Sequence, residues 1–422
     1  MQNAPLSNMR ANQSRSPFAV EPQLAFAVLP PAGVEVDENP SESRAATRPV
    51  RPAAEFFAGM GLVRKGLERA GFGVVFANDN DPAKRELYAD NFDDSDFVLG
   101  DVTDPKIVNG RAVPDITLAT ASFPCTDLSL AGNRAGLIGT DSGAFWGFAR
   151  VLREMGARRP SAIMLENVPS LATSNSGEDL TKVLTELNAQ GYVCDMVILD
   201  ARWFVPQSRP RLFIVASRNK LSEPGDWTPS ALRPAWMRAF VCAHPALRMQ
   251  ACELPMPQRT ADTLNSVVER LPENHVRWWE RERLERFIDS LSAIQSRRLR
   301  RMQTSPTLGW ATAYRRTRGG VATWEIRDDQ IAGCLRTARG GSSKQALVEA
   351  GGGDVRVRWM TPLEYARLQG AGDLTLSTSR ENRALFGLGD AVCVPAVAWL
   401  AANYLRPLVD GEMTDSPAFA RG

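Results

Sequence analysis

The stretch Ala121-Ser-Phe-Pro-Cys-Thr-Asp-Leu-Ser129 is the part of the sequence around which the rest of the chain is organised. It follows an apolar run, residues 116–120, that predicts a buried β-strand. Pro124 lacks the N–H that a sheet ladder needs, so we expect the strand to end there. Cys125 is then the first side chain beyond the carboxyl end of the strand, where open α/β sheets bind ligands. A cysteine in this place is either a small buried filler or a nucleophile.

Two other predicted strands decide between these alternatives. Residues 161–168 form an apolar run that ends in a carboxylate and an amide, Glu166 and Asn167. A segment with two arginines, Gln207-Ser-Arg-Pro-Arg211, leads into a further apolar run, residues 212–216. A thiol, an acid and paired arginines are therefore expected at one edge of a sheet. The expected acid and arginines near Cys125 favour its interpretation as a nucleophile over that as a buried filler.

The composition is that of an ordinary soluble globular protein, with 44% hydrophobic and 23% charged residues and a net charge of +2. Its 422 residues are enough for two or three domains. The six cysteines show no CxxC spacing and there are only two histidines, which argues against a zinc site. Reduced thiols indicate a cytoplasmic protein. We expect no membrane span, because no apolar run is long enough and the start lacks a signal-peptide core.

The pattern of elements predicts five segments. Residues 1–52 are rich in Pro, Ser, Arg and Ala and are expected to be a disordered leader. Residues 53–217 alternate strands and helices, which predicts a catalytic domain with a doubly wound, mostly parallel sheet of seven strands. The alternation is lost in residues 218–358, where we expect a second, smaller domain. Residues 359–408 regain order as a hinge and a C-terminal helix that returns to the first domain, and residues 409–422 form a tail.

The first predicted strand runs into a glycine turn, Phe57-Ala-Gly-Met-Gly61, and then into a helix. This order lets a ligand approach backbone amides at a helix start. A second strand ends at Asp79, about twenty residues later, where a ribose-binding acid belongs; helix capping is the simpler alternative. Asp101, after a third strand, either accepts from an adenine amine or serves a turn. The nicotinamide fingerprint GxGxxG fails, because Arg64 occupies the third glycine position.

Basic residues concentrate between Arg277 and Arg318. The helix expected here is 278–287, and arginine clusters are interleaved with Trp310, Tyr314 and Trp324. A run of charge usually marks only a solvated face. Interleaving with aromatic rings fits a nucleic-acid surface better.

These pieces, in this order, resemble the DNA (cytosine-5) methyltransferases from about Ala54 to Leu405, apart from the basic middle region. The matching motifs are Phe57-Ala-Gly-Met-Gly61, Asn78-Asp79, Gly100-Asp101, Pro124-Cys125 with Ser129, Glu166-Asn-Val168, Gln207-x-Arg209-x-Arg211, Thr361-Pro-Leu-Glu-Tyr-Ala-Arg-Leu-Gln-Gly370 and Phe386-Gly-Leu-Gly-Asp-Ala-Val392. The resemblance implies a methyltransferase-type, Rossmann-like sheet that binds S-adenosylmethionine.

The resemblance also implies roles for individual residues. Cys125 is the nucleophile, Glu166 the acid at ring nitrogen 3, Arg209 holds the base carbonyl, Arg211 orients Glu166, and Asn167 shapes the loop at the strand end. The implied cofactor residues are Phe57, Gly59, Gly61, Asp79, Asn80, Asp101, Val102, Pro124, Asp390 and Val392. The implied DNA contacts are Ser129, Arg134, Arg315, Arg316 and Arg339.

Three positions depart from the family pattern. Thr126 stands where the family often has Gln, and Asn80 where a bulky residue often stacks on adenine. Asp390 replaces the usual Asn of the closing motif, and a carboxylate has no amide donor, so one hydrogen bond must be lost or rearranged.

The resulting hypothesis is methyl transfer from S-adenosylmethionine to carbon 5 of a flipped-out cytosine in a specific duplex DNA sequence, through a covalent Cys125 adduct. Residues 220–335 are expected to choose that sequence. An RNA cytosine-5 methyltransferase of the same fold and a catalytically silent DNA-binding module remain as alternatives; a nicotinamide oxidoreductase is disfavoured by Arg64. No metal is expected, and a cognate restriction endonuclease is one partner that the hypothesis allows.

Overall fold

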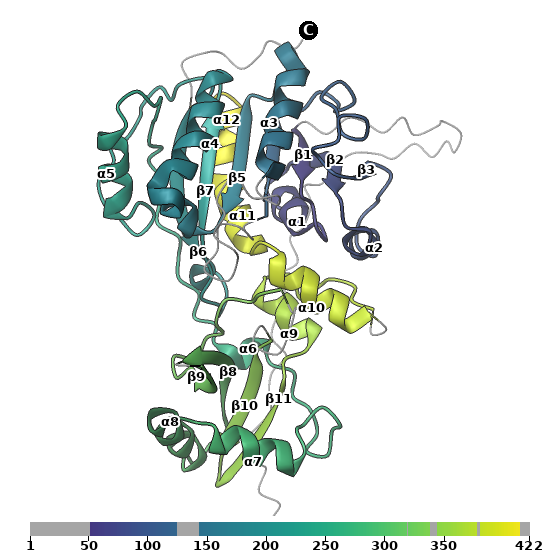
Figure 1. The fold of residues 1–422 in the computed structure, drawn as a ribbon, viewed down its shortest axis with the longest axis vertical. Helices are drawn as coiled ribbons and strands as arrows, with labels where there is room; N and C mark the ends of the chain where they lie inside the picture. Colours follow the sequence, from purple (N-terminus) through teal and green to yellow (C-terminus); the bar gives the residue numbers. More distant parts are fainter. Residues whose placement is uncertain (1–50, 125–142, 319, 338–343, 378–379, 414–422) are drawn as a thin grey trace, which may run out of the picture. The chain divides into compact units, whose positions relative to one another are not determined.

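The computed structural model describes residues 51–124, 143–318, 320–337, 344–377 and 380–413. Within these residues lie two β-sheets, one of seven strands and one of four (Figure 1). Cys125, Ser129, Arg134 and Arg339 lie outside the described residues, as do residues 1–50 of the predicted leader and residues 414–422 of the predicted tail. The first strand begins at Pro52, the last residue of the predicted leader.

The seven-stranded sheet has the strand order β3-β2-β1-β4-β5-β7-β6. All seven predicted strands are present, and their bounds are β1 Pro52–Phe56, β2 Gly73–Asp79, β3 Phe97–Leu99, β4 Leu118–Ala121, β5 Ala162–Asn167, β6 Val193–Asp200 and β7 Pro210–Ser217. Only β7 runs antiparallel to its neighbours; the other pairs are parallel. The predicted mostly parallel, doubly wound sheet is therefore confirmed.

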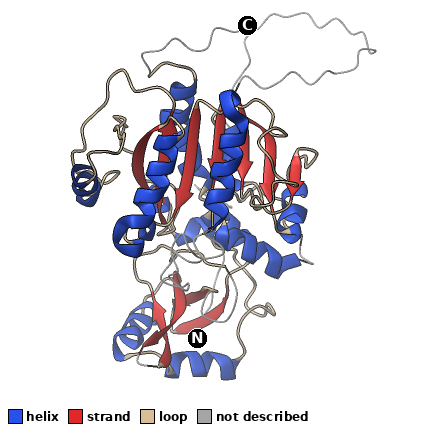
Figure 2. Ribbon diagram, turned by 45° about the horizontal axis from the view of Figure 1, so that its top comes forward, coloured by secondary structure: helices blue, strands red, loops and turns tan. Residues whose placement is uncertain are grey.

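Helices cover both faces of this sheet (Figure 2). On one face lie α3 Gly143–Met155 and α4 Glu178–Ala189; on the other lie α1 Leu62–Glu68 and α11 Val394–Leu400. Successive strand residues point to opposite faces, which the two core clusters show in the pairs Ala53 and Ala54, Leu118 and Ala119, and Met164 and Ile163. Burial on both faces explains why these strands are continuous apolar runs.

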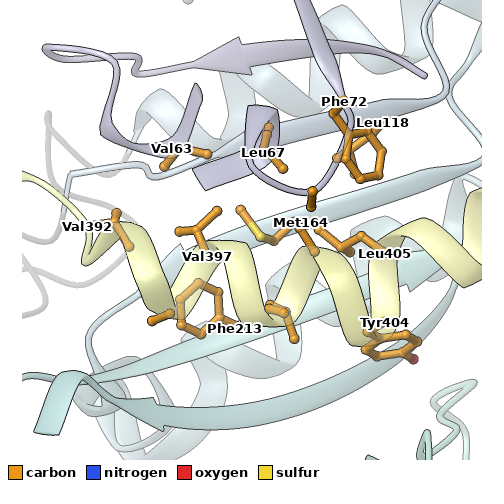
Figure 3. Close-up of a cluster of buried hydrophobic side chains, with 14 of the residues drawn as sticks. Val63, Leu67, Phe72, Leu118, Met164, Phe213, Val392, Val397, Tyr404 and Leu405 are labelled. Atoms are coloured by element: carbon orange, nitrogen blue, oxygen red, sulfur yellow. The ribbon is translucent and has the colours of Figure 1, made fainter. Parts of the chain in front are cut away.

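Helix α11, near the end of the described chain, packs against α1 and the first strands of the sheet. Val63 and Leu67 pack in one cluster with Val397 and Met164 (Figure 3). A Cβ on Gly66 would lie only 2.6 Å from the Cβ of Val397, so a glycine is needed for this approach. The predicted return of residues 359–408 to the first sheet thus has a physical basis in this packing.

The C-terminal helices differ from the expectation. Residues 386–390 belong to α10 Glu381–Asp390, and the predicted helix 392–405 is α11 followed by a π-turn, Ala401–Leu405, and α12 Arg406–Val409. Within the stretch Glu381–Val409, a window of 18 residues is apolar enough to pass for a membrane span, with a mean hydropathy of 1.8. The expectation of no such run was wrong, but 67% of it is buried inside the protein, as in a core helix.

The second sheet is antiparallel, with the order β11-β10-β8-β9. Its strands are β8 Gly309–Arg318, β9 Val321–Ile326, β10 Ala346–Gly351 and β11 Asp354–Trp359, and its own core includes residues of α7 Arg281–Asp289 and α8 Ala293–Gln303. The helix predicted for 278–287 starts later, because Trp279 donates its N–H to Val357 in an extended conformation. Both sheets belong to one compact unit, Arg48–Gly422, so the predicted domain boundaries stay predictions.

Shorter helices complete the described residues: α2 Pro82–Ala89, α5 Ala235–Ala243, α6 Leu264–Val267 and α9 Pro362–Leu368. A capping box begins α9: the side chain of Thr361 accepts from the N–H of Glu364, whose carboxylate accepts from the N–H of Thr361.

Candidate active site and cofactor-binding edge

The segment that leads to Cys125 is held against the end of β5. The side-chain amide of Asn167 donates to the carbonyl of Phe123 at 3.2 Å, and its oxygen accepts from the N–H of Val168 at 2.8 Å. Asn167 is 4% exposed. These bonds join the ends of β4 and β5 two residues before Cys125, which supports the predicted loop-shaping role of Asn167.

Glu166 and Arg211 form an ion pair at the same edge. Arg211 Nε lies 2.9 Å from Glu166 Oε1, and both side chains are largely buried, at 13% and 8% exposure. The antiparallel register explains the meeting: Asn167 is opposite Leu212, so Arg211 lies just past the end of β5. The structure thus brings together an acid and the arginine predicted to orient it.

Arg209 has a different environment from the one predicted. Its side chain is 2% exposed, and the guanidinium donates to the carbonyls of Leu335 at 2.7 Å and Ala391 at 2.6 Å. Longer bonds reach the carbonyls of Gly389 and Asp390, at the end of α10. Burial and the nearby charge of Arg211 lower the pKa of Arg209. These contacts engage both terminal nitrogens of the guanidinium, and the role of Arg209 as the ligand of a base carbonyl stays a prediction. They make Arg209 a link between three distant segments.

Cys334 is a neighbour of both arginines that the sequence did not single out. Its Sγ lies 3.3 Å from Arg209 Nη1 and 3.9 Å from Arg211 Nη2. Burial alone would raise the pKa of the Cys334 thiol, but Arg209 and Arg211 outweigh that effect, and the pKa is lowered. Cys334 belongs to none of the motifs found in the sequence, so only the fold could reveal this contact.

The glycine turn after β1 is tied to the end of β2. The N–H of Gly59 donates to Asp79 Oδ2 at 2.9 Å, and the N–H of Asp81 donates to Asp79 Oδ1 at 3.0 Å. Gly59 and Gly61 have φ of 57° and 83°, and Phe57, with φ of 59°, shares this conformation at a steric cost. A Cβ on Gly59 would meet no atom of the described residues within 4 Å, so the turn borders open space at Gly59 within this part of the chain. Asp81, not Asp79, caps α2, through a bond from the N–H of Ala83 at 2.8 Å.

The remaining predicted cofactor residues have mixed surroundings. Asp101 accepts from the N–H and hydroxyl of Thr103, both at 2.8 Å, which is the contact of a turn residue. Val102 and Val392 are buried in the two core clusters. Asn80 and Pro124 are exposed. The structure therefore brings Gly59 and Asp79 together by direct contact, whereas Asp101 makes its described bonds locally.

Asp390 replaces the expected amide at the end of α10 and is held from two sides. Its Oδ1 accepts from the hydroxyl of Thr337 at 2.6 Å, and its Oδ2 lies 3.3 Å from Lys84 Nζ. Lys84 comes from α2, directly after the Asp79 turn. Nothing in the motif at 386–392 indicated this partner.

Of the four arginines predicted to contact DNA, Arg315 and Arg316 are among the described residues, and both lie on β8. Arg315 and Arg316 are exposed and stand opposite Trp324 and Thr323 of β9. The guanidinium of Arg316 lies over the ring of Tyr314, 5.2 Å from its centroid, and 3.3 Å from a carboxylate oxygen of Glu325.

Glu55 is a buried acid in β1, the strand before the glycine turn, and its pKa is raised. It is 1% exposed, and neither carboxylate oxygen has a hydrogen-bond partner among the described residues. Burial raises the pKa of Glu55 to about 8. Because an unfolded chain releases this proton near pH 4.5, folding should lose stability as the pH rises from that value to about 8. The loss should be on the order of 5 kcal/mol, since one pKa unit corresponds to about 1.4 kcal/mol.

We therefore expect Glu55→Gln to be more stable, relative to the unsubstituted protein, at pH 9 than at pH 5. Urea unfolding of both proteins at pH 5, 7 and 9 measures the difference between their free energies of unfolding. The contributions of the other titrating groups are common to both proteins and cancel in this difference. A difference that stays constant across the three pH values would contradict the assignment.

Comparisons with known proteins agree with this geometry. Residues 53–406 match the family model of the C-5 cytosine-specific DNA methylases. The chain is 34% identical over 169 residues to the type II methyltransferase M.Bsp6I of Bacillus sp. (strain RFL6), and 31% identical over 169 residues to M.HhaI of Haemophilus parahaemolyticus. These matches cover 39% and 40% of this chain, and 52% and 49% of the relatives. The chain thus spans about half the length of the curated relatives it matches.

Among solved structures, the S. pombe Dnmt2 methyltransferase is similar with a TM-score of 0.55 at 18% identity, covering 85% of this chain and 99% of that one. The Entamoeba histolytica methyltransferase EhMeth gives a TM-score of 0.55 at 13% identity, with coverage of 86% and 98%. At this identity the likeness concerns the fold alone. Because the family model extends over most of its length, the chain belongs to the family of C-5 cytosine-specific DNA methylases.

Proposed function

We propose that this protein transfers a methyl group from S-adenosylmethionine to carbon 5 of a cytosine in duplex DNA. The observation that carries the proposal is the buried Glu166–Arg211 pair beside the segment that enters Cys125. An acid held by an arginine at a strand end suits chemistry on a ring that must gain and lose a proton.

Cys125 is assigned the first step. Carbon 5 of cytosine is a poor nucleophile within its aromatic ring. Attack of the Cys125 thiolate on carbon 6 forms a C–S bond and makes carbon 5 electron-rich. Loss of the carbon 5 proton to a base, after methyl transfer, lets the thiolate leave and restores the ring double bond.

Glu166 is assigned to ring nitrogen 3. Negative charge develops there as the sulfur attacks, and a carboxylic acid at this position can supply a proton. Arg211 fixes the orientation of that carboxyl group through the 2.9 Å contact. Since the guanidinium of Arg209 is occupied by main-chain carbonyls, we assign to Arg211 any arginine contact with the base.

The glycine turn and its surroundings fit S-adenosylmethionine. The open space beside Gly59 leaves room for a ligand next to backbone amides. The carboxylates of Asp79, Asp81 and Asp390 suit a ligand that carries positive charge and ribose hydroxyls. When bound, this cofactor supplies an electrophilic methyl group. Asp101, Val102, Asn80, Pro124 and Val392 are retained in the proposal as the remaining cofactor residues.

The cytosine must leave the duplex before its ring is accessible. We propose that residues 218–358 form the target-recognition domain, residues 53–217 the catalytic domain and residues 359–408 the hinge between them. Arg315 and Arg316 are the described residues assigned to DNA; Ser129, Arg134 and Arg339 are assigned with them and lie outside the described residues. The relatives are named type II methyltransferases, so a cognate restriction endonuclease and a cytoplasmic location belong to the proposal.

Bisulfite sequencing of DNA from cells that express the protein tests this function. We expect 5-methylcytosine at one fixed sequence context, and none in cells that express Cys125→Ser. Methylation confined to RNA, mapped in parallel, would favour the RNA methyltransferase instead. Purified protein that binds S-adenosylmethionine but modifies neither nucleic acid would favour the silent DNA-binding module.

Replacing Arg315 and Arg316 by Ala should weaken DNA binding and reduce its dependence on salt. Each lost phosphate contact lowers the slope of log K against log salt by about 0.9. Titrations of labelled duplex at several salt concentrations measure that slope, and cofactor affinity should be unchanged. Arg281→Ala on α7 is the control, because Arg281 is an exposed arginine that pairs with Glu285 on its own helix and lies outside β8. An unchanged slope in the double variant would exclude this face of β8 as the contact surface.

A further inference from the structure

Lys84 joins two segments that are far apart in the sequence. It lies on α2, and its ammonium is 3.3 Å from Asp390 Oδ2 at the end of α10. The two side chains are 21% and 39% exposed. The other oxygen of Asp390 is taken by Thr337, at 2.6 Å. The pair therefore ties the start of α2 to the junction between α10 and α11.

Lys84 is surrounded by more negative charge than one partner supplies. Burial would lower its pKa, but Asp79, Asp390 and Asp81 together outweigh that effect, and the pKa of Lys84 is raised. Asp79 is the residue that holds Gly59 in the glycine turn. The ammonium of Lys84 thus interacts electrostatically with Asp79, which holds the turn after β1, and with Asp390 at the α10–α11 junction. Both segments border the proposed cofactor site.

We propose that Lys84 is a positioning and specificity-determining residue of the cofactor site, which holds the Asp390 carboxylate in place and offsets the charge of Asp79 and Asp81. This inference rests on the proposed function. A carboxylate at position 390 cannot donate a hydrogen bond, whereas an amide can. The ammonium of Lys84 supplies that donor from α2, so positions 84 and 390 act as one unit.

The charge arrangement gives the unit a measurable signature. Three carboxylates and one ammonium leave a net negative site, which attracts the sulfonium of S-adenosylmethionine but not the neutral thioether of S-adenosylhomocysteine. Removal of Lys84 loosens the α10–α11 junction for both ligands and strengthens the attraction for the sulfonium alone. Lys84→Met should therefore weaken S-adenosylhomocysteine binding by roughly tenfold, and S-adenosylmethionine binding by roughly threefold.

A four-protein cycle tests the inference: the full chain, Lys84→Met, Asp390→Asn and the double variant, each titrated with both ligands by calorimetry. In the Asp390→Asn background, the loss of Lys84 should change S-adenosylhomocysteine affinity by less than about twofold, because the partner no longer carries charge. Lys65→Met is the matched control, since Lys65 is a similarly buried lysine, 2.9 Å from Asp373, and should leave the ratio of the two affinities unchanged. Lys84→Arg, which keeps the charge, should bind both ligands close to the wild-type level.

The outcomes separate this inference from the function on which it rests. Equal losses for Lys84→Met in the two Asp390 backgrounds, or an unchanged ratio of the two affinities, would overturn the role of Lys84 alone. A full chain that binds neither ligand would instead overturn the cofactor assignment. If Lys84→Met does not fold, Asp390→Asn still decides: a ratio of the two affinities that stays within about twofold of the wild-type ratio in that variant would count against a coupled pair.

Discussion

Duplex DNA that carries 5-fluorocytosine at the target position should become covalently attached to the protein, and Cys125→Ser should abolish the attachment. The fluorine at carbon 5 cannot leave as a proton does, so an adduct formed by attack on carbon 6 persists after methyl transfer. A hydroxyl is far less ionised than a thiol at neutral pH, so the serine variant should also lose at least about 10³-fold in methylation rate. Denaturing electrophoresis detects the attached complex, which should form efficiently only when S-adenosylmethionine is present.

The same experiment separates a nucleophile from a buried filler. Cys125→Ser should still bind DNA, because binding depends on other residues. Cys242→Ser is the matched control: Cys242 is an exposed cysteine on α5, and its loss should leave trapping intact. Peptide mapping of the adduct then identifies the attached residue. A crosslink at Cys334, whose thiol lies beside Arg209 and Arg211, or wild-type methylation by Cys125→Ser, would refute the assignment.

The sequence predicted the seven-stranded sheet well because most of its strands are buried on both faces. In Ala162–Asn167 the first four residues are apolar, and the acid and amide that follow mark the end of the strand. Helix ends were less predictable, since they depend on partners outside the helix. Trp278 and Trp279 suit a helix by composition, yet they pair with β11, about eighty residues away in the sequence.

Long-range contacts also limited the prediction of the site. Glu166 and Arg211 could be placed together because both flank strands whose ends meet at one sheet edge. The environment of Arg209 could not be predicted, because its carbonyl partners lie 126 to 182 residues further along the chain. The same holds for Lys84 and Asp390, which only the packing of α10 brings together. Local pattern identifies which residues are chemically capable, whereas tertiary contacts decide which of them face a substrate.

Arg209 and Arg211 should therefore respond very differently to the same substitution. Arg209→Lys keeps the charge but cannot reach the carbonyls of Leu335, Gly389 and Ala391 at once, because a lysine ammonium lacks the planar fork of a guanidinium. With buried carbonyls left without donors, the free energy of unfolding should fall by about 3 kcal/mol or more. Urea unfolding measures this loss, and the folded fraction should retain the chemistry of the Glu166–Arg211 pair.

Arg211→Lys should show the reverse. The bond from Nε to Glu166 would be replaced by a contact without fixed orientation, so the methylation rate should fall by roughly 10²-fold while unfolding changes by less than about 1 kcal/mol. Glu166→Gln should lower the methylation rate by a similar factor. Adding Arg211→Lys to Glu166→Gln should lower the rate little further, because both substitutions remove the same interaction. Single-turnover methylation with saturating cofactor and DNA measures the chemical step. The opposite pattern would be a large rate loss with unchanged stability in Arg209→Lys and a stability loss with a normal rate in Arg211→Lys. That pattern would contradict the roles assigned from the contacts and would make Arg209 the residue that binds the base carbonyl.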